Sequence, residues 1–123
     1  MRKITKKAVR AFVNRFEFNQ SNTEVYPTAI GNFGSDAVQM YLHGNLIAEY
    51  SSYILKISFC GWPTATTKER LNGLTENLFG RGIFYIKDGV LRMDHMNEDI
   101  EICSKAVHTF KYVNSVWVYS GKS

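Results

Sequence analysis

Short segments of alternating apolar and polar residues, separated by pairs of turn-forming residues, constrain the fold of this chain more than any other feature. The clearest example is IFYI-KDG-VLRM, in which Asp88 and Gly89 stand between two alternating runs. Asp-Gly is typical of the tight two-residue turn of a β-hairpin. The segment therefore predicts two antiparallel strands joined by that turn.

The same pattern recurs along the chain. Gly44-Asn45 and Ser51-Ser52 are expected turn pairs within a three-stranded meander, and Asn114-Ser115 divides a last hairpin. The expected strands are 37–43, 46–50, 53–60, 83–87, 90–93 and a C-terminal pair near 106–113 and 116–119.

Residues 17–36 are rich in Asn, Ser, Thr and Gly, whose side chains and backbone favour turns. A short strand is expected near Thr23 to Tyr26. Because proline has no N–H to donate to a neighbouring strand, Pro27 restricts this strand to a sheet edge.

An N-terminal helix is predicted by apolar residues that recur at the spacing of one helical face. These residues are Val9, Phe12, Val13 and Phe16. Thr5 is the expected N-cap, with Ile4 and Val9 placed to form a hydrophobic staple around it.

A second helix is expected at about 66–78. Leu71, Leu74 and Leu78 give its buried stripe. Thr66 and Glu69 fit the T-x-x-E spacing of a capping box at its start.

The chain has 123 residues, 45% of them hydrophobic, which suits one core. We expect a single α+β domain over residues 1–123. It has a mostly antiparallel sheet, a basic N-terminal helix and the second helix near 66–78.

A cytoplasmic protein without a membrane partner is expected. No apolar run approaches the roughly 18 residues that span a bilayer, and the N-terminus lacks the apolar core of a secretory signal. Cys60 and Cys103 are isolated in alternating runs, and we expect both to be reduced, packed thiols.

The positive charge of the chain is concentrated at its N-terminus. The net charge is +4, yet residues 1–16 hold six cations and no acid, so the rest of the chain is slightly acidic. Four of the cations share one face of the expected helix: Lys3, Lys6, Lys7 and Arg10. Such a block indicates a polyanionic partner, and these four are candidate nucleic-acid contacts. The alternative is an ordinary solvated helix face.

The segment CGWPTATTKERLNGL, residues 60–74, contains the strongest candidate binding site. The first turn of a helix exposes unpaired N–H groups and the positive end of the helix dipole, which attract anions. The candidate anion or phosphate ligands are Thr64, Thr66, Thr67, Lys68 and Arg70. The alternative is an ordinary capped helix, because Glu69 competes for the same N–H groups.

Trp62, which precedes Pro63, is a further candidate nucleic-acid contact that would stack on a base or close a pocket. The alternative is that it packs in the core, as a tryptophan after a buried strand commonly does.

Catalysis and metal binding have little support in the sequence. The histidines and cysteines lack metal-ligand spacing, and there is no nucleophile–base pairing, P-loop or dinucleotide fingerprint. The acidic segment from Asp94 to Glu101 is expected to be a solvated loop rather than a cation site. We therefore expect no enzyme activity, no cofactor and no metal.

Three segments resemble a group of small bacteriophage proteins of unknown function: RAFVNRFEFNQSNTEV, LHGNLIAEY and KISFCGWPTATTKERLNGL. The resemblance covers about residues 5–74, and its most specific part is a G-W-x-T-x-T-T-x-x-R-L-N pattern. The matching positions are Gly61, Trp62, Thr64, Thr66, Thr67, Arg70, Leu71 and Asn72, with Asn22, Thr23, Gly44 and Asn45 upstream. Residues from 94 onward match nothing in that group. The resemblance implies a phage protein in the host cytoplasm and supplies no activity.

Two functions follow as hypotheses. The first is a binding protein that holds a nucleic-acid backbone on the basic helix and the Thr/Lys/Arg helix start, and double-stranded DNA is the nucleic acid expected first. In that case Arg70→Ala would weaken binding without unfolding the domain. The alternative is a phage inhibitor that blocks a host protein such as a defence enzyme, a nuclease or a polymerase. A homodimer through an exposed edge strand or through the Tyr- and Trp-rich C-terminus is left open.

Overall fold

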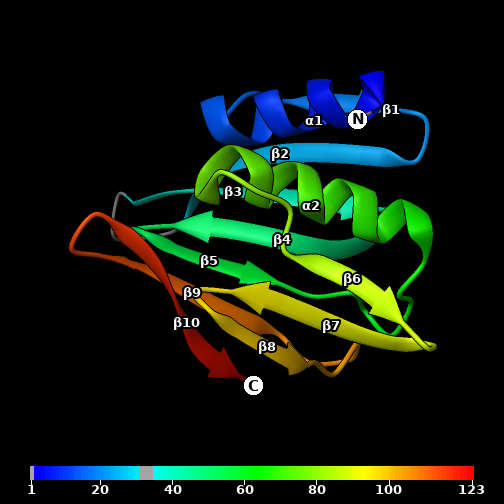
Figure 1. Cartoon of the computed structure of the whole chain (residues 1–123). Coiled ribbons are helices and arrows are strands. Elements are labelled where there is room, and N and C mark those ends of the chain that lie inside the picture. Colours follow the sequence, from blue (N-terminus) through cyan, green and yellow to red (C-terminus); the bar gives the residue numbers. More distant parts are fainter. Residues whose placement is uncertain (1, 31–34) are drawn as a thin grey trace.

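The computed structural model of the chain describes residues 2–30 and 35–123. Its main layer is a seven-stranded antiparallel sheet in the order β1-β2-β3-β4-β5-β9-β10 (Figure 1). The strands are β1 Phe18–Gln20, β2 Thr23–Ile30, β3 Ser35–Leu42, β4 Asn45–Ser51, β5 Ile54–Ile57, β9 His108–Val113 and β10 Val116–Lys122.

Two helices, α1 Lys3–Asn14 and α2 Ala65–Phe79, lie on one face of this sheet (Figure 1). A second, three-stranded antiparallel sheet follows α2 in the chain. It consists of β6 Phe84–Lys87, β7 Val90–His95 and β8 Glu98–Glu101. The expected α+β class with a mostly antiparallel sheet and an N-terminal helix is confirmed.

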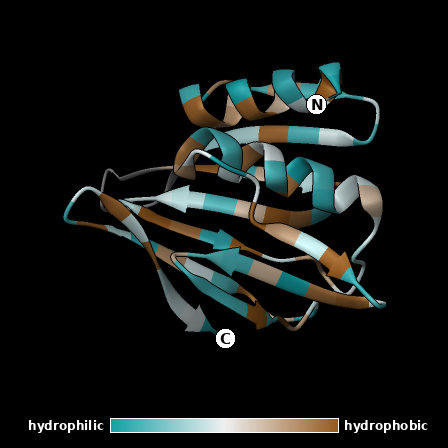
Figure 2. Ribbon diagram, in the orientation of Figure 1, coloured by the Kyte–Doolittle hydropathy of each residue, from teal (hydrophilic) through white to brown (hydrophobic). Residues whose placement is uncertain are grey.

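The core lies between the large sheet and the helices. Val38, Met40 and Leu42 of β3 are buried and alternate with more exposed residues, as the period of a strand requires. They share one apolar cluster with Phe12 of α1 and Leu71 of α2. Figure 2 shows the matching bands of hydrophobic and hydrophilic residues along the strands.

Two of the predicted turn pairs are confirmed and two are wrong by one residue. Asp88-Gly89 and Asn114-Ser115 have positive φ at both positions, as a type I′ turn requires. The other two turns are His43-Gly44 and Ser52-Tyr53, because Leu42 pairs with Asn45 and Ser51 with Ile54. The register of each strand pair is set by which face of the strands is buried. This register places the two turns one residue away from the pairs that local turn preference favours.

Two segments predicted as turn or loop contain strands. Within 17–36, β1 pairs with a β2 that runs past the predicted end at Tyr26. Pro27 is accommodated because the pairing with β1 ends at Val25, so at Pro27 only β3 lies alongside. Residues 31–34 lie outside the described residues. The acidic segment after Asp94 is also no loop, because β8 pairs with β7 along its length.

Both helices begin earlier than predicted, α1 by three residues and α2 by two. The N-cap of α1 is Arg2 and not Thr5, which is buried inside the first turns. The N-cap of α2 is Thr64, whose Oγ1 accepts the N–H of Thr67 at 3.1 Å, and not Thr66. The expected capping box and hydrophobic staple are therefore wrong. Neither of these two helices combines the length and apolarity that crossing a bilayer demands.

Candidate nucleic-acid interface

Four cations cover the exposed side of α1, and we call them the basic face: Lys3, Lys6, Lys7 and Arg10. All four side chains are exposed, because the opposite side of the helix carries the apolar residues that pack on the sheet. In the part of the chain that the structure describes, none of the four takes part in an ion pair. The basic face is thus a positive surface without ion pairs, although Glu76 of α2 lines a pocket together with Lys6 and Arg10.

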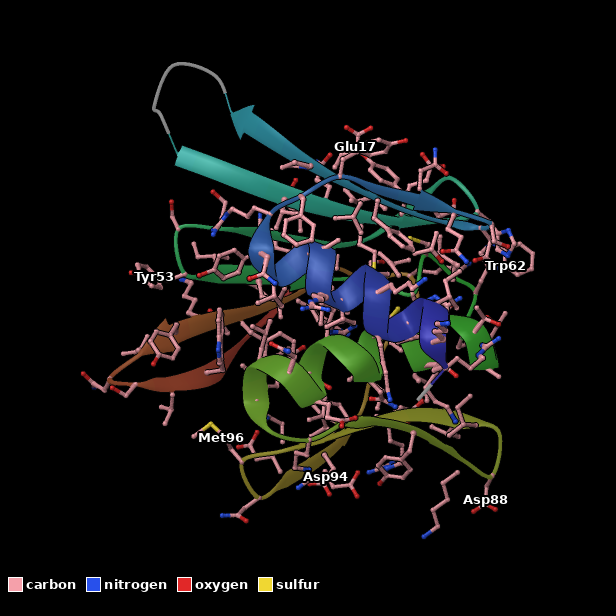
Figure 3. The ribbon with its side chains drawn as sticks, turned by 90° about the horizontal axis from the view of Figure 1, so that it is seen from above. Glu17, Tyr53, Trp62, Asp88, Asp94 and Met96 are labelled. Carbon is pink, nitrogen blue, oxygen red and sulfur yellow. The ribbon has the colours of Figure 1, made fainter. Side chains whose placement is uncertain are left out.

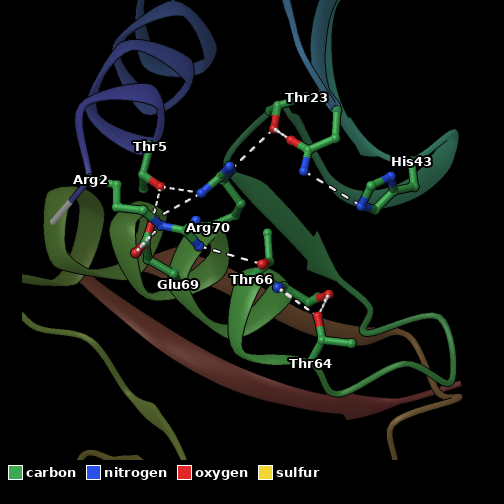
Figure 4. Close-up of polar contacts among 10 residues, drawn as sticks. Arg2, Thr5, Thr23, His43, Thr64, Thr66, Glu69 and Arg70 are labelled. Carbon is green, nitrogen blue, oxygen red and sulfur yellow. Dashed lines mark hydrogen bonds and ion pairs between the residues drawn. The ribbon is translucent and has the colours of Figure 1, made fainter.

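The structure brings the start of α1 against the start of α2, as the sequence hypothesis required. Nε of Arg2 lies 2.7 Å from Oε2 of Glu69, and the guanidinium also donates to Oγ1 of Thr66 at 3.4 Å (Figure 4). These contacts join the N-terminal segment to the candidate anion-binding turn.

Arg70 is buried, with 1% of its surface exposed. Its Nε donates to Oγ1 of Thr23 at 3.1 Å, and its Nη1 donates to Oε1 of Glu69 at 2.9 Å and to Oγ1 of Thr5 (Figure 4). A phosphate outside the molecule does not reach this guanidinium. The expectation that Arg70 flanks a bound phosphate does not fit this placement, because the three acceptors already satisfy the charge inside the fold.

Burial lowers the pKa of Arg70 below its ordinary value, and the charge of Arg2 adds to this, while Glu69 acts in the opposite direction. Burial also acts to raise the pKa of the Glu69 carboxyl. The hydrogen bonds from Thr5 and Arg2 and the positive charges of Arg2 and Arg70 outweigh it, so this pKa lies below its usual range. Glu69 is therefore an ionised partner of two arginines, not the cap that its spacing suggested.

The first turn of α2 is occupied by its own capping contacts. The hydroxyls of Thr64 and Thr67 lie 2.9 Å apart, and Thr67 is buried. Thr64 is exposed, whereas Thr66 and Lys68 are half-buried. This arrangement fits the ordinary capped helix, and an anion at this turn stays a prediction that rests on Thr64, Thr66 and Lys68.

Trp62 is 67% exposed, so the interpretation that it packs in the core is wrong. Figure 3 shows it projecting from the end of the molecule where both helices begin. It borders a pocket of about 310 Å³ that reaches from the β3–β4 turn to Thr64 and Thr67. His43, which sequence reasoning did not select, also lines this pocket.

The segments that carry the phage-protein resemblance converge around this pocket and the buried arginine. Nδ2 of Asn22 lies 3.5 Å from Nε2 of His43, Thr23 bonds to Arg70, and Asn45 lines the pocket with Trp62. Spacing along the chain could not have shown this convergence, because the contacts join segments that are far apart in the sequence.

Other candidate chemistry finds no geometric support in the described residues. Over residues 2–30 and 35–123, no cluster of three or more His, Cys, Asp or Glu side chains could hold a metal ion. Asp94 and Asp99 form ion pairs with Arg81 and Arg92. Cys60 is half-buried but Cys103 is exposed, so the expected packing is wrong for Cys103.

In a comparison with protein families, the family model described as Kyanoviridae Gp96 protein matches residues 1–118. The match extends well past residue 74, into the C-terminal strands that the sequence resemblance left unassigned. No curated protein and no solved structure matches the chain.

Proposed function

We propose that this chain, which belongs to the Kyanoviridae Gp96 family of phage proteins, holds the backbone of a nucleic acid on the basic face of α1. We expect the nucleic acid to be DNA rather than RNA. The observation that supports the proposal is four exposed cations on one helix without an ion-pair partner in the described structure. Like charges at i and i+4 destabilise a helix by roughly 0.2–0.5 kcal/mol per pair. Lys3 with Lys7 and Lys6 with Arg10 form two such pairs, which phosphates would neutralise.

The neighbouring start of α2 extends this surface. Arg2 and Thr66 are in contact, and Lys68 follows in the same turn. Phosphate contacts position a protein on its ligand without reading bases, so we expect weak sequence preference. Arg70 has no part in this interface.

The test is a fluorescence-anisotropy titration of labelled DNA and RNA at several salt concentrations. Binding weakens with salt at a slope near −0.9 per neutralised phosphate. Replacing Lys6, Lys7 and Arg10 together by Gln should flatten that slope by up to about three units.

The matched control removes the same charge elsewhere. Lys56, Lys111 and Lys122 are exposed on β5, β9 and β10, and replacing all three by Gln should leave the slope almost unchanged. Absence of binding by the wild-type chain at low salt, or equal effects of the two triple variants, would show that the basic face is not the binding surface.

The second candidate function is an inhibitor of a host protein, which a different surface favours. Tyr53 is 64% exposed and stacks on Tyr112 with ring centroids 6.0 Å apart. Val113 and Val116 are exposed beside Tyr112 on the β9–β10 hairpin. Exposed tyrosines grouped with apolar residues are typical of protein interfaces.

A pull-down from nuclease-treated host lysate separates the two functions. A stoichiometric partner that is lost with Tyr53→Ala and Tyr112→Ala, but retained by the basic-face variant, favours the inhibitor. Recovery of a second copy of the chain would instead indicate self-association through this hairpin.

A further inference from the structure

The pocket beside Trp62 has the form of a small ligand site. Its volume of about 310 Å³ lies at the lower end of the roughly 300–1,000 Å³ that is usual for ligand pockets. The apolar part of its lining includes three buried residues, Leu42, Ile47 and Phe59, together with the exposed ring of Trp62. His43, Asn45 and Thr64 contribute polar groups and are exposed. An apolar interior with a polar rim suits a flat ring that has hydrogen-bonding groups on its edge.

The backbone around Trp62 is held in place although the side chain is exposed. The N–H of Trp62 donates to the carbonyl of Phe59 at 2.9 Å, and its carbonyl accepts the N–H of Thr64 at 2.8 Å. Cys60 has φ 54°, a conformation that is costly for a residue with a side chain. The same left-handed conformation occurs at the hairpin turns of this chain, so Cys60 and Gly61 form a turn of that kind immediately before Trp62.

A nucleobase matches these features only when it is unpaired. In a duplex both faces of a base are covered by its neighbours, whereas an unpaired base exposes a face that an aromatic side chain can cover. The amide of Asn45 and the ring of His43 offer donors and acceptors to the edge of such a base. The positive charges of the adjoining helix starts favour the phosphate that accompanies it.

We propose that this pocket binds one unpaired nucleobase stacked on Trp62, supplied by a single-stranded segment or by a free nucleotide. If the base belongs to a single strand, the proposal rests on the proposed function and adds the class of nucleic acid that is bound. The basic face then follows the backbone of the same strand, and a blunt duplex engages the basic face alone.

The first measurement compares a single-stranded DNA oligonucleotide with a blunt duplex of the same length. The wild-type chain should bind the single strand more tightly. Trp62→Ala should weaken single-strand binding roughly 5- to 150-fold, as loss of one base–aromatic stack does, and leave duplex binding unchanged. Trp62→Phe, which keeps an aromatic face, should retain most of the affinity. Tyr53→Ala is the matched control, because Tyr53 is equally exposed at the other end of the molecule (Figure 3).

The second measurement does not depend on strand binding. The chain has two tryptophans, so its NMR spectrum holds two indole N–H signals, and Trp62→Phe identifies the one from Trp62. Deoxyadenosine monophosphate should shift the Trp62 signal and leave that of Trp117 in place. Thermal unfolding of each variant confirms that it is folded.

The outcomes keep the two proposals apart. If no oligonucleotide binds at low salt, the backbone function is wrong, and the indole shift alone decides this proposal: a shift supports a free-nucleotide pocket, and no shift overturns it. If oligonucleotides bind but Trp62→Ala changes neither the single-strand affinity nor the response to the nucleotide, the base pocket is wrong and the backbone function stands.

Discussion

The positively charged guanidinium of Arg70 is buried, and it donates hydrogen bonds to oxygen atoms of Thr5, Thr23 and Glu69. Arg70→Met should lower the free energy of unfolding by roughly 3 kcal/mol, because it removes a buried guanidinium that donates to the buried hydroxyls of Thr5 and Thr23 and to the half-buried carboxylate of Glu69. The loss lies at the low end of the range for such pairs because Glu69 keeps Arg2.

Urea unfolding measures this effect, with Arg2→Ala as the comparison. Arg2 is 53% exposed in its pair with Glu69, and exposed pairs contribute about 0–1 kcal/mol. A smaller loss for Arg70→Met than for Arg2→Ala would contradict a structural role. The earlier expectation that Arg70→Ala affects binding alone is replaced by this prediction.

His108 is buried as a neutral imidazole. Its Nε2–H donates to the carbonyl of Cys103 at 2.9 Å, and its Nδ1 accepts the hydroxyl hydrogen of Tyr119 at 2.9 Å. Burial lowers the pKa of His108, the Cys103 carbonyl opposes this, and the charge of Lys122 adds to the lowering. The unfolded chain therefore binds a proton at a higher pH than the folded chain.

This contribution to stability is complete above the unfolded pKa of about 6.5 and is lost as pH falls below it. We expect the free energy of unfolding to decrease from pH 7 downward, and His108→Gln to flatten that decrease. His43→Gln is the control because His43 is exposed. An unchanged pH dependence in His108→Gln would refute the assignment.

At the scale of the elements, α2 tests which of two threonines in one segment is the N-cap: Thr64, as the structure shows, or Thr66, as the sequence predicted. Thr64→Ala should lower the free energy of unfolding by about 1 kcal/mol, because the N–H of Thr67 loses its acceptor. Thr66→Ala should have a much smaller effect, although it is the same substitution two residues away. The opposite ranking in thermal or urea unfolding would restore the capping box first expected at Thr66.

The elements whose signals are local were predicted well. The apolar stripe of α2 and the hairpin at Asp88-Gly89 depend on neighbouring residues and are found where expected. The start of α2 was misplaced because Glu69, at the spacing of a cap, instead binds Arg2 and Thr5 from a distant segment. Strand β8 was missed because its acidic residues resemble a loop until β7 lies beside it.

The candidate site was predictable in part for the same reason. Charge placement alone located the basic face, and the Thr-rich segment indicated a helix start beside it. Burial of Arg70 depends on Thr5 and Thr23, and exposure of Trp62 depends on the turn at Cys60-Gly61, so neither was accessible from local pattern.

At the scale of the whole molecule, β5 pairs with β9 across the segment that contains α2 and the three-stranded sheet. That segment nevertheless shares the core of the large sheet. The ring of Phe59 lies 5.2 Å from that of Phe84 on β6, and Phe79 lies 5.7 Å from Trp117 on β10. A three-stranded sheet is marginal without such packing, so we expect it to unfold with the rest.

Because the two sheets share one core, we expect residues 1–123 to unfold as one domain. Trp62→Phe leaves Trp117, which is 9% exposed, as the single tryptophan and a reporter of the core. Its fluorescence and the far-UV circular dichroism should follow one urea transition with the same midpoint, as in a two-state domain. Adding Phe59→Leu removes the ring contact with Phe84, and it should lower the midpoints of both measurements together. If dichroism is lost in a separate step while Trp117 stays native, the small sheet or α1 unfolds independently, and the chain is not one cooperative unit.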